Sequence, residues 1–202
     1  MSANEPLNII ITGVGGQGNV VASRLLATAA VAAGFQAAVG ETFGAAQRGG
    51  AVVSHVRISA QTIFGPLIPR GRAEIILGLE PLETLRVLLD YGRPETMVIM
   101  NDRPVRPISV LSGQERYPDP AKIEQAARRL APDTRLVPAV DLALGLGQAG
   151  AANVVMLGAL LAAGRLPLER SHFETALAEV FPPELVELNT QALAAGLAVA
   201  GG

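Results

Sequence analysis

The sequence contains no cysteine and only two histidines among its 202 residues. Disulfides, iron–sulfur clusters, thiolate zinc sites and cysteine nucleophiles are therefore excluded for this chain. With His55 and His172 alone, a histidine-built metal site is not expected either, so we predict no metal ligands here. Any redox or metal chemistry in which the protein takes part must be carried by another component.

Charged residues are also scarce. They make up 17% of the chain, whereas about 25% is usual in soluble domains. Two explanations are open: a partner subunit covers part of the surface, or coding bias favours alanine and arginine, since Lys122 is the only lysine. The net charge of −2 provides no basic surface for nucleic acid.

No apolar run is long enough to cross a membrane. The longest nearly apolar stretch, residues 149–164, contains Asn153 and falls short of the roughly 20 residues required. The N-terminus has no basic segment before its first apolar run, so no signal peptide is expected. We therefore expect a cytoplasmic protein, with residues 1–202 forming a single domain.

Short apolar runs alternate with helical patterns along the chain. The predicted strands are residues 7–12, 35–39, 51–58, 74–79, 96–100 and 135–140. The predicted helices are residues 18–33, 81–91, 120–130, 153–163 and 184–200. Residues 62–64 are predicted to pair with the strand at 51–58, and Ser171 with Glu174 to form a capping box. The alternation predicts an α/β, three-layer, Rossmann-like fold with a mostly parallel sheet and a helical C-terminal region.

A glycine-rich segment follows the first predicted strand and opens the first predicted helix. Residues 13–18 match the G-x-G-x-x-G pattern of dinucleotide-binding turns. In that setting Gly13 permits a tight turn, Gly15 a close approach of backbone or ligand, and Gly18 close packing of the helix, whose N-terminus offers N–H groups to an anion. The alternative is that the glycines serve strand–helix packing alone.

A second glycine-rich segment spans residues 40–50. Its polar and terminal residues are Glu41, Gln47, Arg48, Gly49 and Gly50. An arginine in such a loop is suited to binding phosphate or carboxylate in a forked geometry, and Glu41 lies where dinucleotide folds place an acid. A Glu41–Arg48 ion pair that merely closes the loop explains the same residues, and both interpretations stay open.

No self-sufficient catalytic set is visible, because neither a Ser-His-Asp order nor a G-x-S-x-G elbow occurs. We interpret His55 as a buried sheet residue and His172 as a surface residue at a helix start. Glu80 and Glu83 follow a predicted strand at the end where open α/β sheets bind ligands. A favourable interaction with a helix N-terminus would explain Glu83 equally well, so we assign no catalytic residue.

Four segments of the chain form a specific series: ITGVGGQGNVVASRLLA, VGETFGAAQRGGAVVSHVRIS, AEIILGLEPLETLR and NVVMLGALLAAG. In this order they resemble the gamma-type domain of the 2-oxoacid:ferredoxin oxidoreductases, most closely the small (beta) subunits of the indolepyruvate ferredoxin oxidoreductases. The resemblance runs from Asn8 to the C-terminal helices. The glycine motif alone is not specific for this family, whereas the glycine motif followed by GETFGAAQRGG and GLEPLE is specific for it.

The resemblance implies a subunit of a complex that oxidatively decarboxylates a 2-oxoacid, such as indolepyruvate or another arylpyruvate, to an acyl-CoA and passes electrons to ferredoxin. It implies a large alpha subunit that binds thiamine diphosphate, Mg²⁺ and [4Fe–4S] clusters, with coenzyme A as co-substrate and no cofactor on this chain. The cofactor-binding or partner-facing residues that it implies are Gly13, Gly15, Gly16, Gln17, Gly18, Glu41, Gln47, Arg48, Gly49 and Gly50. It also favours a buried face between subunits as the reason for the low charge.

Two alternatives remain. One is a free-standing NAD(P)-dependent oxidoreductase, for which neither a second lobe nor an acid–base residue is evident. The other is a Rossmann-like module that binds coenzyme A or an adenine nucleotide without performing chemistry.

Overall fold

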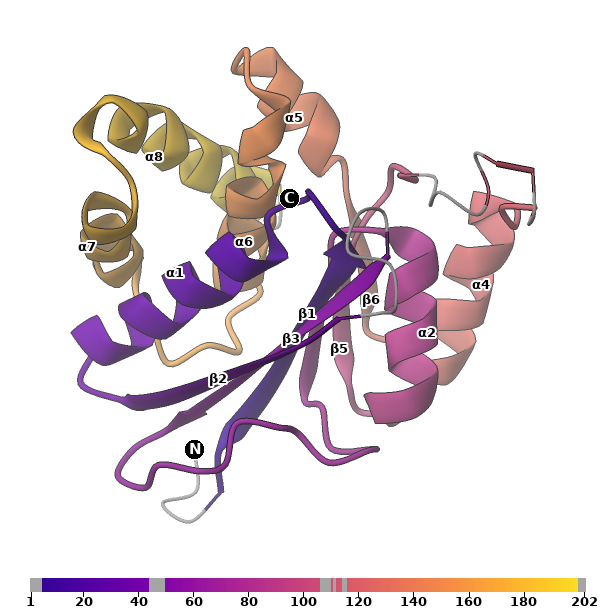
Figure 1. Ribbon diagram of the computed structural model, residues 1–202, viewed down its shortest axis with the longest axis horizontal. Coiled ribbons are helices and arrows are strands. Elements are labelled where there is room, and N and C mark those ends of the chain that lie inside the picture. Colours follow the sequence, from indigo (N-terminus) through magenta and orange to yellow (C-terminus); the bar gives the residue numbers. More distant parts are fainter. Residues whose placement is uncertain (1–4, 44–49, 106–109, 111, 114–115, 200–202) are drawn as a thin grey trace.

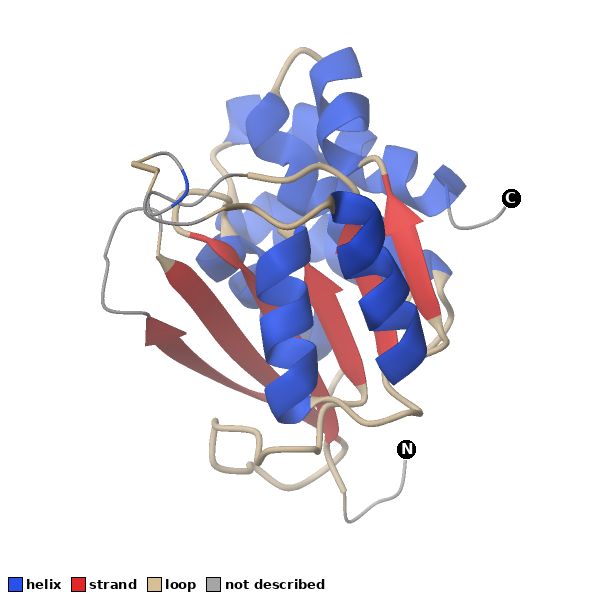
Figure 2. Cartoon of the chain, turned by 90° about the vertical axis from the view of Figure 1, so that its right-hand side faces the viewer, coloured by secondary structure: helices blue, strands red, loops and turns tan. Residues whose placement is uncertain are grey.

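The computed structural model describes residues 5–43, 50–105, 110, 112–113 and 116–199 (Figure 1). Within them the strands are β1 (Leu7–Val14), β2 (Gln36–Phe43), β3 (Ala51–Ser59), β4 (Ile75–Gly78), β5 (Met97–Asn101) and β6 (Thr134–Val137). The helices are α1 (Asn19–Ala32), α2 (Pro81–Tyr91), α4 (Pro120–Leu130), α5 (Ala139–Gly145), the 3₁₀ turn η1 (Ala149–Ala151), α6 (Ala152–Ala162), α7 (Arg170–Val180) and α8 (Pro183–Val199). Helices α2 and α4 cover one face of the sheet and the others lie across the opposite face (Figure 2). The predicted three-layer α/β fold is confirmed.

The strand order in the sheet is β2-β3-β1-β4-β5-β6. Strand β1 pairs in parallel with β4, β4 with β5, and β5 with β6, whereas β3 is antiparallel to both β1 and β2. The sheet is thus mostly parallel, as predicted. The predicted pairing of residues 62–64 with β3 is wrong, because β1 and β2 already occupy the two edges of β3.

Several predicted boundaries are also corrected. Residues 40–43 extend β2 instead of belonging to a loop, since they continue its ladder with β3. Strand β6 ends at Val137, because Pro138 follows and α5 starts directly after it. The predicted cap at Ser171 is wrong: α7 begins after Glu169, whose N–H donates to Nδ1 of His172 over 2.9 Å.

Each face of the sheet has its own apolar core. Ile9 and Ile11 of β1 pack with α1 and α6, while Ile10 points to the side of α2 and α4. Helix α6 is buried along most of its length and crosses α8 closely. At that crossing a Cβ atom on Gly196 would lie 1.9 Å from the backbone oxygen of Val155. Only glycine fits there.

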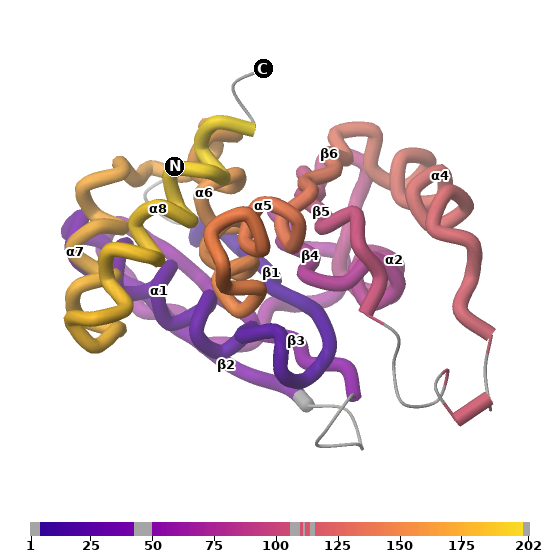
Figure 3. The backbone as a smooth tube through the Cα atoms, turned by 90° about the horizontal axis from the view of Figure 1, so that it is seen from above, coloured from indigo at the N-terminus to yellow at the C-terminus, as the bar shows by residue number. Residues whose placement is uncertain are grey.

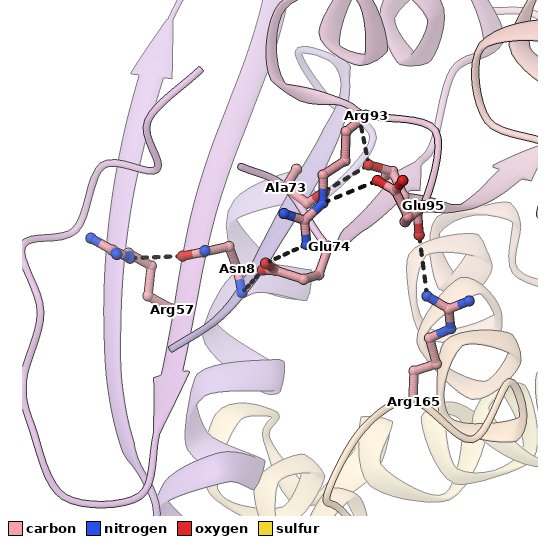
Figure 4. A network of polar contacts seen from close by, with 8 residues as sticks. Asn8, Arg57, Ala73, Glu74, Arg93, Glu95 and Arg165 are labelled. Carbon is pink, nitrogen blue, oxygen red and sulfur yellow. Dashed lines mark hydrogen bonds and ion pairs between the residues drawn. The ribbon is translucent and has the colours of Figure 1, made fainter. Parts of the chain in front are cut away.

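A polar network closes the end of the sheet where β1 and β4 begin (Figure 4). The N–H of Asn8 donates to Oε2 of Glu74 over 2.7 Å, and Nη2 of Arg93 donates to Oε1 of Glu74 over 3.0 Å. Nε of Arg57 donates to Oδ1 of Asn8 over 2.9 Å. These bonds join β1, β3 and the segments that lead into β4 and β5, so we interpret the network as structural.

Candidate functional site

The turn between β1 and α1 carries the glycine motif and is held by Gln17. Its Oε1 accepts the N–H of Val14 over 2.7 Å, and its Nε2 donates to the carbonyl of Leu79 over 2.9 Å. Gly16 and Gly18 have φ values of 103° and 82°, a region that side-chain-bearing residues rarely adopt. Gln17 therefore ties the glycine turn to the carboxyl end of β4.

The glycines at both ends of the motif are required by contacts within the protein. A Cβ atom on Gly13 would lie 2.6 Å from Oε1 of Gln17 and 3.0 Å from Oδ1 of Asn19. On Gly18 it would lie 2.3 Å from Nδ2 of Asn153, which donates to the Gly18 carbonyl over 3.1 Å. The start of α6 is thereby held against the start of α1.

The second glycine-rich segment meets the first at one point. The N–H of Gly15 donates to the carbonyl of Gly50 over 3.0 Å. Glu41 lies in β2, half-buried and in register with Ser54. The predicted site residues Gln47, Arg48 and Gly49 lie outside the described residues. The structure thus joins Gly50 to the glycine turn and places Glu41 in the sheet.

The N–H groups of the turn that could still bind an anion are those at the start of α1. The N–H groups of Val14 and Gly15 are used by Gln17 and Gly50, so they are not available to a phosphate. Helix α1 begins at Asn19, and its N-cap Gly18 supplies no side-chain cap, so the first-turn N–H groups carry the favourable end of the helix dipole without a side-chain acceptor. A dinucleotide in the usual mode would lose two of its expected donors.

A cavity of about 290 Å³ adjoins the turn. It lies at the carboxyl end of the parallel strands, where α5 sits above β1 (Figure 3). Its main apolar lining residues are Leu79, Val105, Ala139, Val140 and Met156. Gln17, Asn101 and Asn153 supply its polar side chains, and among the described residues no charged side chain lines it. Asn101 was not identified from the sequence, because its neighbours come from distant segments.

Glu80 is fully buried beside this end of the sheet. Its Oε2 accepts the N–H of Glu83 over 2.9 Å, which makes it the N-cap of α2, and its Oε1 accepts the hydroxyl of Tyr117. Burial raises the pKa of Glu80, and these hydrogen bonds oppose the rise. Burial and the neighbouring Glu80 raise the pKa of Tyr117. Glu83 forms a 2.6 Å ion pair with Arg86, so both carboxylates have structural partners.

His55 is buried in β3, as the sequence indicated. Its Nδ1 accepts the N–H of Ile68 over 3.4 Å, and its ring meets Tyr91 edge-on at 5.4 Å between centroids. Burial lowers the pKa of His55. These contacts favour a neutral structural imidazole over a catalytic one.

The described residues contain neither a cluster of metal ligands nor a helix that could span a membrane. No group of three or more histidine, aspartate or glutamate side chains there is arranged to hold a metal ion. Nor does any helix in that part of the chain have the length and apolar character needed to span a bilayer.

Comparison with known proteins gives a match over nearly the whole chain. Residues 8–199 match the family model described as pyruvate ferredoxin/flavodoxin oxidoreductase. The chain is 40% identical over 190 residues to indolepyruvate oxidoreductase subunit IorB of Archaeoglobus fulgidus, covering 94% of this chain and 93% of that protein. It is 36% identical over 194 residues to IorB of Pyrococcus horikoshii, covering 96% and 95%.

Solved structures agree with this match. The gamma subunit of a keto/oxoacid ferredoxin oxidoreductase from Geobacter sulfurreducens superposes with a TM-score of 0.68 at 25% identity, covering 96% of this chain and 97% of that one. The 2-oxoglutarate:ferredoxin oxidoreductase of Magnetococcus marinus, solved with 2-oxoglutarate, coenzyme A and succinyl-CoA, shares the fold at a TM-score of 0.72 and 20% identity, with 98% of this chain matching 31% of that one. The chain belongs to the pyruvate ferredoxin/flavodoxin oxidoreductase family of oxidoreductases.

Proposed function

We propose that this chain is the small subunit of a thiamine-diphosphate-dependent 2-oxoacid:ferredoxin oxidoreductase that acts on indolepyruvate or another arylpyruvate. The observation that carries the proposal is similarity along the whole chain to proteins that are themselves single subunits of indolepyruvate oxidoreductases. The product would be an acyl-CoA, and the electrons would pass to ferredoxin. A soluble complex in the cytoplasm is the setting we propose.

The residues of this chain support the proposed division of labour. It has no cysteine for a cluster, and the described residues hold no metal-binding group. A large alpha subunit would bind thiamine diphosphate, Mg²⁺ and [4Fe–4S] clusters, and these would supply decarboxylation and single-electron transfer. This chain, as one domain, would contribute a surface and binding groups for coenzyme A.

The surface we propose for the partner is the end of the molecule that carries the glycine turn. Four exposed large apolar side chains lie on elements that border it: Val20 on α1, Val105 after β5, Leu144 on α5 and Leu185 on α8. Six more exposed large apolar side chains lie on other parts of the described residues, so the choice of this end rests on its closeness to the glycine turn. Exposed apolar groups on a low-charge chain are typical of a surface that another subunit covers.

Within this surface we propose that the first glycine segment and the second loop bind the phosphate groups of coenzyme A. The uncapped start of α1 supports an anion there. The two segments comprise Gly13, Gly15, Gly16, Gln17, Gly18, Glu41, Gln47, Arg48, Gly49 and Gly50. Glu41, as a carboxylate, would pair with Arg48 and not with a phosphate, and Gln17 and Gly15 would hold the turn through the bonds described above. Arg48 would form the forked contact to phosphate, for which its guanidinium geometry is suited.

Co-expression tests the assembly. The chain with the cysteine-rich, thiamine-binding product of a neighbouring reading frame should co-purify as a brown complex that reduces ferredoxin when given indolepyruvate and coenzyme A. The complex without this chain should lose activity. Failure to co-purify with any such partner, together with micromolar binding of NAD(H) or NADP(H) by the isolated chain, would favour the free-standing dehydrogenase instead.

A pair of arginine variants tests the proposed phosphate contact. Arg48→Ala should weaken coenzyme A binding by the complex while leaving the melting temperature unchanged. Arg129→Ala on the exposed side of α4 is the control and should change neither property. A large loss of stability in Arg48→Ala with unchanged affinity would show that the loop arginine is structural.

A further inference from the structure

One buried polar side-chain atom that belongs to the lining of the cavity beside the glycine turn has no hydrogen-bond partner among the described residues. Both polar atoms of the Gln17 amide are used, by Val14 and Leu79. Nδ2 of Asn153 donates to the Gly18 carbonyl. Nδ2 of Asn101 donates to the carbonyls of Leu79 over 3.2 Å and Arg103 over 3.0 Å. Its Oδ1 is buried and has no partner among the described residues.

The orientation of the Asn101 amide follows from its neighbours. If the amide were flipped, Oδ1 would face two carbonyl oxygens, those of Leu79 and Arg103, and both hydrogen bonds would be lost. The side chain is only 2% exposed, and a buried acceptor without a donor costs about 1–3 kcal/mol. Such a group calls for a donor, and the described residues do not provide one.

The lining indicates what kind of molecule would bring that donor. Leu79, Val140 and Met156 make the walls apolar, and no charged side chain of the described residues lines them. A cation would find no counter-ion here, and an anion would face the unpaired acceptor Oδ1 of Asn101, which cannot donate a hydrogen bond to it. A neutral group is therefore favoured.

The size of the cavity limits the ligand further. At about 30 Å³ for each water-sized unit, 290 Å³ holds roughly ten non-hydrogen atoms. We infer that this cavity binds a neutral, mainly apolar group of that size, which donates one N–H or O–H hydrogen bond to Oδ1 of Asn101. Because Oδ1 is buried, contact with the donor requires the Asn101 amide to turn about its soft terminal torsion, which weakens the two Nδ2 hydrogen bonds to Leu79 and Arg103.

Two sources present this chemistry: a free aromatic ring with an N–H, or an amide within a longer coenzyme arm. Calorimetric titration of the full chain with indole and with pantetheine separates them. Indene, which has the shape of indole without its N–H, is the matched control ligand. Binding of indole, pantetheine or both at micromolar to low millimolar concentration is expected, and indene should bind at least about fivefold more weakly than indole.

Variants locate the binding. Asn101→Leu should weaken the bound probe at least about fivefold, and Val140→Phe should abolish binding by filling the cavity. Leu144→Phe, on the same helix but exposed and outside the lining, should bind as the parent chain does. If Asn101→Leu fails to fold, the location of the bound probe is still tested by comparing Val140→Phe with Leu144→Phe, and the role of the N–H group by comparing indole with indene.

The inference is overturned if neither probe binds, if indole and indene bind equally, or if Val140→Phe leaves binding unchanged. It does not depend on the proposed function, since the titrations need neither a partner subunit nor turnover. A chain that binds indole but never assembles with a partner would support this site and contradict the proposed complex.

Discussion

Replacement of Gln17 by alanine removes both bonds that tie the glycine turn to β4. The two losses are unequal. The N–H of Val14 is buried and would be left without an acceptor, whereas the carbonyl of Leu79 would keep the Asn101 donor at 3.2 Å. One orphaned buried group costs about 1–3 kcal/mol, so Gln17→Ala should lose about that much free energy of unfolding. In a chain of this size that lowers the melting temperature by roughly 2–4 °C per kcal/mol.

Urea unfolding followed by far-ultraviolet circular dichroism is the suitable assay, since the chain has no tryptophan. The Gln17→Ala, Asn101→Leu double variant provides a sharper test, because it deprives the Leu79 carbonyl of both side-chain donors. The double loss should exceed the sum of the single losses by about 0.5–3 kcal/mol. A Gln17→Ala chain within about 0.5 kcal/mol of the parent, or strict additivity, would refute this account of the turn.

Three further predictions concern the rest of the fold. Gly196→Ala places a Cβ against the Val155 backbone and should cost about 1–3 kcal/mol or more in the same assay, whereas Gly145→Ala, with nothing near its Cβ, should be neutral. Because burial lowers the pKa of His55, the unfolded chain takes up that proton first. The contribution of neutral His55 to the free energy of unfolding should be complete above about pH 6.5 and should decrease as the pH falls below that value. The variant His55→Gln should therefore lose less stability on acidification than the parent chain, as measured by the midpoints of urea unfolding. Tyr117→Phe should cost about 1–3 kcal/mol by removing the hydroxyl donor to buried Glu80; a neutral result by thermal melting would contradict the role given to that bond.

The layers of the fold could be predicted because they depend on local patterns. The continuous apolar runs of β1, β4 and β5 are typical of strands buried on both faces. Pro81 and Pro120 marked two helix starts correctly. The α6 prediction succeeded for a similar reason, since a helix that is apolar all round has to be buried.

The errors arose where pairing is non-local or where two local patterns compete. Nothing near residues 51–58 distinguishes pairing with residues 62–64 from insertion between β1 and β2, because the choice depends on which edges are free in the assembled sheet. At α7, Ser171–Glu174 and Glu169–His172 both have the spacing of a capping box, and the second begins the helix. Asn101 was missed because its partner Leu79 lies 22 residues away, after a different strand, and the local bond to the Arg103 carbonyl has no sequence signature.

The glycine motif shows what such a pattern measures. A side chain on Gly13 would collide with Gln17 and Asn19, and one on Gly18 would collide with Asn153. Contacts within this chain therefore explain both glycines without a ligand. The fingerprint therefore predicts a close strand–turn–helix contact, which is confirmed, and leaves the ligand open. Two donors that a dinucleotide would use are already bonded to Gln17 and Gly50. A ligand must thus be argued from groups that remain unsatisfied, among them the uncapped start of α1 and the buried Oδ1 of Asn101. These two features favour different chemistry: an anion at the first and a neutral hydrogen-bond donor at the second.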